Sequence, residues 1–132
     1  MSLDLSDLVG GWGLESVTMT AADGQLVHPF GTQPEGLLLY TNDGWMSATI
    51  TGTGEATGQT IYAGQVFVRA DEVLHRVVVG VPPFGPGTEQ VRKVRFADRD
   101  RLVLTAPPDQ FAGAVIELVW RRKPVSTETA VN

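Results

Sequence analysis

The chain has 132 residues, which is enough for one compact domain and too few for two independently stable cores. Hydrophobic residues make up 42% and charged residues 19%, so the composition excludes a disordered chain. The net charge of −5 argues against binding to nucleic acid or to an acidic membrane surface. Cysteine is absent, which excludes disulfides and thiolate nucleophiles and fits a reducing compartment.

The N-terminal segment predicts one helical turn over Asp4–Val9, whose apolar residues would brace one end of the fold. The first residues, Met1–Asp7, are acidic and lack the charged-then-apolar pattern of a secretion signal. No apolar run is long enough for a transmembrane span. The sequence therefore predicts a cytoplasmic protein with no membrane partner.

From Trp12 onward, apolar and polar residues alternate, and Gly and Asp punctuate the pattern. Alternation with period two predicts β-strands. The expected strands are Gly11–Thr20, Gln25–Phe30, Gly36–Thr41, Trp45–Thr51, Ile61–Ala70, Val73–Val81, Glu89–Ala97, Arg101–Ala106 and Ala114–Arg122. Short strands that recur at such close intervals are typical of an all-β sandwich or barrel.

The turns favour a barrel over a sandwich. Asp23-Gly24 and Asp43-Gly44 predict tight hairpins, and most connections join neighbouring strands. An up-and-down order of this kind closes without a long free edge. We therefore expect an all-β fold, a single antiparallel up-and-down barrel over residues 1–123, with a disordered tail over 124–132. Two longer loops, Gly52–Thr60 and Pro82–Thr88, are expected to frame its mouth.

Three stretches of the chain resemble the lipocalin-like domain family, which is of the calycin type. The first is Leu8–Leu14, which contains a Gly-x-Trp motif, and the second is Pro34–Ser47, which has the family's pattern of glycine, tyrosine and turn residues. The third is a set of segments that begins at Tyr62–Gly64, continues through His75 and Gln90–Arg92, and ends at Leu118–Arg122. The resemblance implies a barrel that holds a small, largely apolar molecule. Some members act in natural-product biosynthesis, where such barrels bind or cyclise polyketide-like or terpenoid-like intermediates. The chain departs from the family at Gly52–Thr60, a short loop where the family carries a longer, partly helical insert.

The family resemblance also implies a structural role for Trp12. In lipocalins a first-strand Trp packs at the closed end of the barrel beneath an Arg from the last strand. The partner here is Arg122, or Arg121 if the register slips by one residue. A cation–π contact of this kind contributes about 0.5 to 2 kcal/mol. A ligand contact by Trp12 is the alternative.

Alternation assigns inward-facing polar residues. Lys93 and Arg95 should face water, so Gln90 and Arg92 turn toward the interior, and the same argument places His75 inside. A buried guanidinium requires a carboxylate, several carbonyls or a ligand group as its partner. Two interpretations stay open: an internal network of Arg92 with His75, Gln90 and a tyrosine, or a ligand-binding site.

Tyr40 and Tyr62 are the only tyrosines, and Tyr62 is expected to point inward. Its hydroxyl would bond to backbone or donate to a ligand oxygen. Glu15 and Glu117 are expected on the outside of adjacent first and last strands, as a solvated pair beside Arg121. The alternative for either carboxylate is a general base of raised pKa.

The sequence predicts neither a metal site nor a cofactor. Histidine occurs only at positions 28 and 75, and no motif ties either to a serine nucleophile. A haem held by one axial histidine is the minor alternative.

These observations lead to a binding barrel as the main hypothesis. Its candidate ligand-binding residues are Tyr40, Tyr62, His75, Gln90, Arg92, Phe96 and Trp120, with Val77, Val79, Val94 and Leu118 as further apolar lining. The alternative is a cofactor-independent cyclase, isomerase or dehydratase in which His75, Arg92 and Tyr62 are catalytic. A third class is an interaction module with a filled barrel, in which outward apolar residues form a homodimer face.

Overall fold

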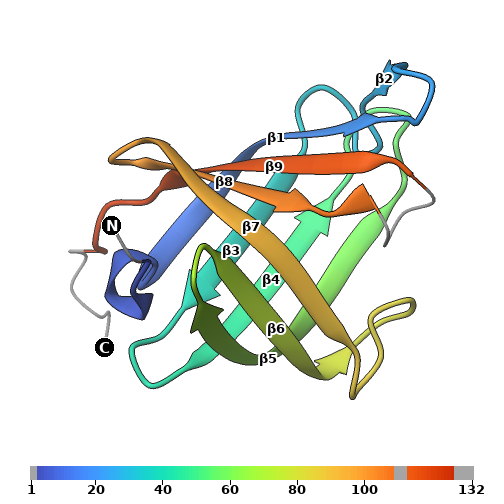
Figure 1. Cartoon of the computed structure of the whole chain (residues 1–132). Helices are drawn as coiled ribbons and strands as arrows, with labels where there is room; N and C mark the ends of the chain where they lie inside the picture. Colours follow the sequence, from blue (N-terminus) through green and yellow to red (C-terminus); the bar gives the residue numbers. More distant parts are fainter. Residues whose placement is uncertain (1–2, 109–112, 127–132) are drawn as a thin grey trace, which may run out of the picture.

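The computed structural model describes residues 3–108 and 113–126. Over these residues the chain forms one 3-10 turn and nine strands (Figure 1). They are η1 (Leu5–Asp7), β1 (Gly10–Thr20), β2 (Leu26–Val27), β3 (Glu35–Tyr40), β4 (Trp45–Thr51), β5 (Gln59–Arg69), β6 (Glu72–Gly80), β7 (Glu89–Asp98), β8 (Arg101–Ala106) and β9 (Val115–Arg122). The predicted all-β class is confirmed.

The strands form one closed antiparallel barrel. β3 to β9 pair in chain order, and β1 pairs with both β3 and β9, so that these eight strands leave no edge among them. β2 is the extra strand and pairs only with the end of β1, at Met19 and Thr20. Figure 1 shows η1 at one end of the barrel and β2 at the other. The up-and-down order predicted from the short connections is therefore confirmed.

A β-bulge in β1 changes which residues face the interior. The pairing of β1 with β9 passes from Leu14↔Trp120 to Ser16↔Val119, so Glu15 is the extra residue. Trp12 is buried before the bulge and Val17 after it, an odd separation that unbroken alternation would not allow. The bulge therefore lets one strand line both the closed end and the cavity described below.

A second bulge overturns one sequence expectation. The pairing of β5 with β6 passes from Ala63↔Val79 to Gly64↔Val77, so Val78 is the extra residue. Val77 is buried, but Val79 is 61% exposed, and the prediction that Val79 lines the interior is wrong. Gly64 permits the close approach, because a Cβ there would collide with the backbone carbonyl of Arg76.

The second strand is shorter than the sequence predicts. The expected strand Gln25–Phe30 is reduced to Leu26–Val27. Pro29 has no N–H to donate to a ladder, and Gly31 follows in a left-handed conformation with φ of 84°. The chain consequently leaves the sheet and carries Phe30 to the barrel mouth.

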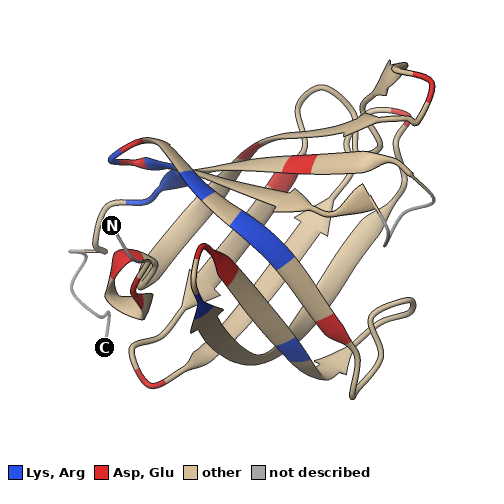
Figure 2. Cartoon of the chain, viewed as in Figure 1, with Lys and Arg blue, Asp and Glu red and all other residues tan. Residues whose placement is uncertain are grey.

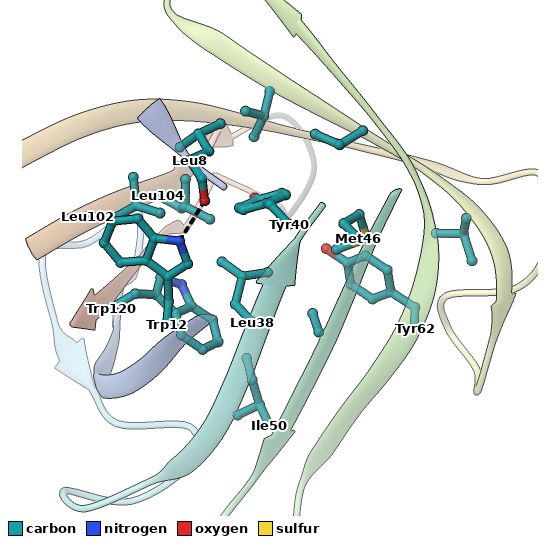
Figure 3. Close-up of a cluster of buried hydrophobic side chains, with 14 residues drawn as sticks. Leu8, Trp12, Leu38, Tyr40, Met46, Ile50, Tyr62, Leu102, Leu104 and Trp120 are labelled. Carbon is teal, nitrogen blue, oxygen red and sulfur yellow. Dashed lines mark hydrogen bonds between the residues drawn. The ribbon is translucent and has the colours of Figure 1, made fainter. Parts of the chain in front are cut away.

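Trp12 closes the opposite end of the barrel. Its Nε1 donates to the backbone oxygen of Leu8 at 2.8 Å, which ties the N-terminal turn to the core (Figure 3). Arg122 lies over the indole ring, with Cζ 4.2 Å from the ring centroid. Its Nη2 also donates to the backbone oxygen of Asp7 at 3.2 Å. The structure therefore contains the predicted cation–π contact, made by Arg122 and not by Arg121.

The two carboxylates expected on the outside lie there but do not pair with each other. Glu15 accepts hydrogen bonds from Nε of Arg101 and Nε of Arg121, each at 2.9 Å. Both bonds lower the pKa of Glu15, and the bond from Arg121 has the larger effect. Glu117 lies 3.8 Å from Arg95. Figure 2 shows charges of both signs on the same strands. The ion pairs with arginine favour the solvated interpretation over a general base.

Large apolar side chains are exposed on part of the outer surface. Leu39, Trp45 and Phe67 are exposed on β3, β4 and β5. Pairing of two chains through such a face stays a prediction.

Within the described residues, no helix has the length and apolar character needed to cross a bilayer. The predicted tail 124–132 lies mostly outside the described residues, so its disorder also stays a prediction.

Candidate functional site

The barrel encloses a cavity of about 220 Å³. Apolar side chains from opposite sides of the barrel form most of its wall, and they share inward-facing positions on the strands. They include Val17, Met19, Leu38, Ala48, Ile50, Leu104, Ile116, Leu118 and Trp120. Figure 3 shows this apolar interior, with Trp120 on one side and Tyr62 on the other.

Two aromatic residues from loops stand at the mouth of the cavity. Phe84, in the loop after β6, packs against Tyr62 with ring centroids 5.1 Å apart. Gly80 makes room for this fold-back, since a Cβ there would clash with the backbone oxygen of Phe84. Phe30 lines the cavity from the loop after β2.

The loop over residues 52–60 supports that arrangement. Oγ1 of Thr53 donates to the backbone oxygen of Gln33 at 2.7 Å, which holds the loop against the segment that carries Phe30. Thr60, which belongs to the loop range named from the sequence but lies at the start of β5, lines the cavity itself. Both long loops named from the sequence therefore contribute to the mouth. The loop after β2, whose first residues were predicted as strand, contributes as well.

A chain of three buried side chains forms the polar corner. The Tyr40 hydroxyl lies 2.7 Å from Nε2 of His75, and the Tyr62 hydroxyl lies 2.7 Å from Nδ1. The three residues come from β3, β6 and β5, and each is at most 6% exposed. Tyr62 and His75 line the cavity, whereas Tyr40 lies behind His75.

Burial keeps this chain electrically neutral. It lowers the pKa of His75 to about 3, with a smaller contribution from the nearby positive charge of Arg92. It also raises the pKa of Tyr62 to about 12 and that of Tyr40 well above its usual value. At neutral pH the imidazole is therefore uncharged, and both hydroxyls keep their protons.

A neutral imidazole gives the chain a direction. One ring nitrogen carries a proton and donates, and the other accepts, so one tyrosine donates to the ring and the other receives from it. With the proton on Nδ1, Tyr40 donates to Nε2, Nδ1 donates to the Tyr62 oxygen, and the Tyr62 hydroxyl proton points elsewhere. Since Tyr62 lines the cavity, that tautomer supplies the cavity with a hydrogen-bond donor.

Arg92 adds a positive charge to the same corner. It lies on β7, is 7% exposed and lines the cavity. Its Nη1 donates to the backbone oxygen of Val91 at 2.8 Å. Burial lowers its pKa, and the two tyrosines oppose that shift. The structure therefore places the guanidinium inward, as the sequence predicted from the outward position of its neighbour Lys93.

The structure brings together only part of the predicted ligand-binding set. Tyr62, His75, Arg92 and Trp120 line the cavity. Gln90 lies directly opposite His75 in the β6–β7 ladder and is half-buried, outside the lining. Phe96 lies at the closed end, with its ring centroid 6.5 Å from that of Trp12.

Three of the predicted apolar lining residues lie elsewhere. Val94 lines a surface hollow at the closed end with Phe96, and Val77 is buried in the core. Val79 is turned outward by the bulge described above. β7 crosses the barrel obliquely (Figure 1), so Val94 and Phe96, past Arg92 on this strand, lie at the closed end and not at the cavity.

Among the lining residues that sequence reasoning missed are the two mouth aromatics and the small residue Ala48. Phe30 and Phe84 each stand beside proline and glycine. A large aromatic residue in a segment that otherwise resists regular structure is a detectable signal, because such a side chain must find cover. Ala48 carried no comparable signal.

Two further observations limit the chemistry of the site. Nε1 of Trp120 is buried, and it has no hydrogen-bond partner among the described residues. A buried donor of this kind is costly unless a water or a ligand accepts from it. Within the described ranges, no three His, Cys, Asp or Glu side chains converge as a metal site would need.

Comparison with known proteins supports the fold. A family model described as a lipocalin-like domain matches residues 9–61. The crystal structure of a lipocalin-like protein from Bacteroides uniformis is 18% identical, with 89% of this chain and 99% of that chain covered and a TM-score of 0.54.

Two other solved structures are similar. A redesigned β-barrel is 17% identical, with coverage of 94% and 98% and a TM-score of 0.53. The structure of EF1p2_mFAP2b bound to DFHBI is 15% identical, with coverage of 89% and 95% and a TM-score of 0.50. No curated protein matches the chain. At these identities the structural likeness concerns the fold alone.

Proposed function

We propose that this chain, a lipocalin-like β-barrel, binds one small, largely apolar molecule in its interior. The observation that carries the proposal is the cavity of about 220 Å³ with apolar walls and one polar corner. Apolar burial drives entry into such a site, and the few polar groups orient the ligand. A structural neighbour of the same fold is bound to a small molecule, DFHBI.

The cavity volume limits the size of the ligand. An engineered apolar protein cavity of about 150 Å³ is large enough for benzene. A cavity of about 220 Å³ therefore suits a molecule of one substituted ring or two small rings. A compact polyketide-like or terpenoid-like molecule with an oxygen group has this size and this distribution of polarity.

A cavity-filling substitution tests the proposal. Ala48 is 4% exposed and lines the cavity, while its neighbour Thr49 faces outward on the same strand. We expect wild-type protein and Thr49→Leu to bind the neutral probe 4-nitroanisole, and Ala48→Leu to bind it at least about tenfold more weakly, which corresponds to about 1.4 kcal/mol. Calorimetric titration measures all three. Equal affinity in both variants would place the ligand outside the barrel.

The Tyr40–His75–Tyr62 chain supports a second candidate function, a cofactor-independent cyclase or isomerase. Linked donors beside Arg92 could move a proton and stabilise an oxyanion. However, a general base works best when its pKa lies near the operating pH, and burial lowers the pKa of His75 to about 3. His75 is thus a weak base, and binding is favoured over proton abstraction.

A further inference from the structure

We propose that the cavity selects molecules that present one ionised oxygen, such as a small phenolate or enolate, and that Arg92 and Tyr62 hold that oxygen. The inference rests on the proposed binding function and narrows its ligand to a chemical class. Its basis is the charge, the hydrogen-bond chain and the shape of the polar corner.

Among the described residues, the cavity lining carries a positive charge. Its titratable side chains are Tyr62 from β5, His75 from β6 and Arg92 from β7, with Tyr40 from β3 behind the imidazole. The lining residues within the described ranges include no carboxylate. Because the histidine and tyrosines are neutral, the guanidinium supplies the charge. Its attraction for an anion is strengthened by the low dielectric of the interior.

The hydrogen-bond chain also favours an anion in the cavity. When Nδ1 of His75 carries the proton, Tyr40, His75 and Tyr62 form successive donors that end at the cavity. Each bond in such a chain polarises the next, which makes the last hydroxyl a stronger donor. An ionised oxygen accepts from that hydroxyl and from the guanidinium together, in the manner of an oxyanion hole.

The shape of the site favours one oxygen over a carboxylate. Among the described lining residues, Tyr62, His75 and Arg92 form the polar corner, and apart from Thr60 nearly all of the remaining wall is apolar. A carboxylate would bring two oxygens and a localised charge, which need more polar partners than this corner contains. A phenolate or enolate spreads its charge over a conjugated body that the apolar wall can cover.

The test compares two probes that differ at one group. 4-Nitrophenol ionises and changes its absorbance when it does, whereas 4-nitroanisole has a methyl ether in place of the hydroxyl. We expect wild-type protein to bind the phenolate at least about tenfold more tightly than the phenol or the ether. By linkage, the pKa of bound 4-nitrophenol should then fall by about 1 unit or more, read directly from absorbance against pH.

Variants assign the effect to the two residues. Arg92→Met and Tyr62→Phe should each reduce the fall in the pKa of 4-nitrophenol while both proteins still bind 4-nitroanisole. Arg95→Met is the matched control, because it removes an arginine from the same strand whose side chain is 61% exposed. It should behave as wild type. Since Tyr62→Phe preserves the charge and the ring, it also serves if Arg92→Met does not fold.

The outcomes separate this inference from the function on which it rests. If wild-type protein binds both probes equally and the pKa of 4-nitrophenol is unchanged or raised, the inference is wrong and the binding function stands. Tighter binding of 4-nitrobenzoate than of 4-nitrophenolate would also overturn the choice of a single oxygen. If neither 4-nitroanisole nor 4-nitrophenol binds, the proposed function fails, and this inference fails with it.

Discussion

Replacing Arg92 by Met tests the interior of this barrel most directly. Methionine matches the unbranched aliphatic stem of arginine and carries no charge, so it removes the guanidinium while it keeps the cavity wall apolar. Arg92 is 7% exposed, and its pKa is lowered first of all by burial, which means that the folded protein bears a desolvation cost for the charge. Removing that cost contributes stability to the variant.

The opposing loss includes the hydrogen bond from Nη1 of Arg92 to the backbone oxygen of Val91, which contributes about 1 kcal/mol. Replacement of buried charge by apolar side chains ranges from neutral to a gain of several kcal/mol. We therefore expect the free energy of unfolding of Arg92→Met to lie between the wild-type value and about 2 kcal/mol above it, a rise in Tm of a few degrees.

Binding should change in the opposite direction. Loss of a charge-assisted hydrogen bond to the ligand oxygen should weaken the binding of 4-nitrophenolate at least about tenfold. Urea denaturation and calorimetric titration on the same preparation give both quantities, and Arg95→Met serves as the exposed control.

Two results would refute this reasoning. A loss of several kcal/mol in the free energy of unfolding would show that Arg92 neutralises an internal anion, which the substitution leaves unpaired. Unchanged stability together with unchanged affinity would show that the guanidinium is neither costly to bury nor part of the binding site.

Two predictions concern the pH dependence of stability and the ion pairs of Glu15 on the outer surface. Because burial lowers the pKa of His75 from 6.5 to about 3, the free energy of unfolding should decrease as the pH falls through that interval, with a slope of up to about 1.4 kcal/mol per unit from this group. His75→Gln should show a shallower decrease than the exposed control His28→Gln in urea titrations at pH 7 and 4, and equal slopes would contradict the assignment. Glu15→Gln should lower the free energy of unfolding by about 1 kcal/mol at pH 7, because the carboxylate joins Arg101 and Arg121 across three strands. Since these arginines lower the pKa of Glu15 from 4.5, that difference should begin to shrink as the pH falls below 4.5 and should be lost once the pH falls through the lowered pKa, and a difference that stays constant from pH 7 to pH 3 would assign the loss to packing.

The sequence by itself determined the architecture. Alternation with period two and the turns at Asp23-Gly24 and Asp43-Gly44 are local signals, since each depends on neighbouring residues alone. Their number and spacing were sufficient to predict an up-and-down barrel. Local alternation also oriented Arg92 and His75, because no bulge separates either residue from its outward-facing neighbour.

Only the tertiary structure decided how the strands meet. The extra residues Glu15 and Val78 shift the pairing of their strands, and a shift of one residue turns every later side chain to the other face. A bulge is a property of the pairing between two strands, so alternation within one strand does not reveal it. The outward position of Val79 and the inward position of Val17 follow from this pairing.

The polar corner depended on closure in the same way. Tyr40 and Tyr62 are 35 and 13 residues from His75 in the chain, and their hydroxyls reach its two ring nitrogens only because β3, β5 and β6 curve around one interior. The loop that carries Phe30 leaves its sheet at a proline and then covers the mouth of that interior. Local alternation thus oriented Arg92 and His75, and barrel closure decided which inward residues meet, because curvature and register arise from contacts between strands.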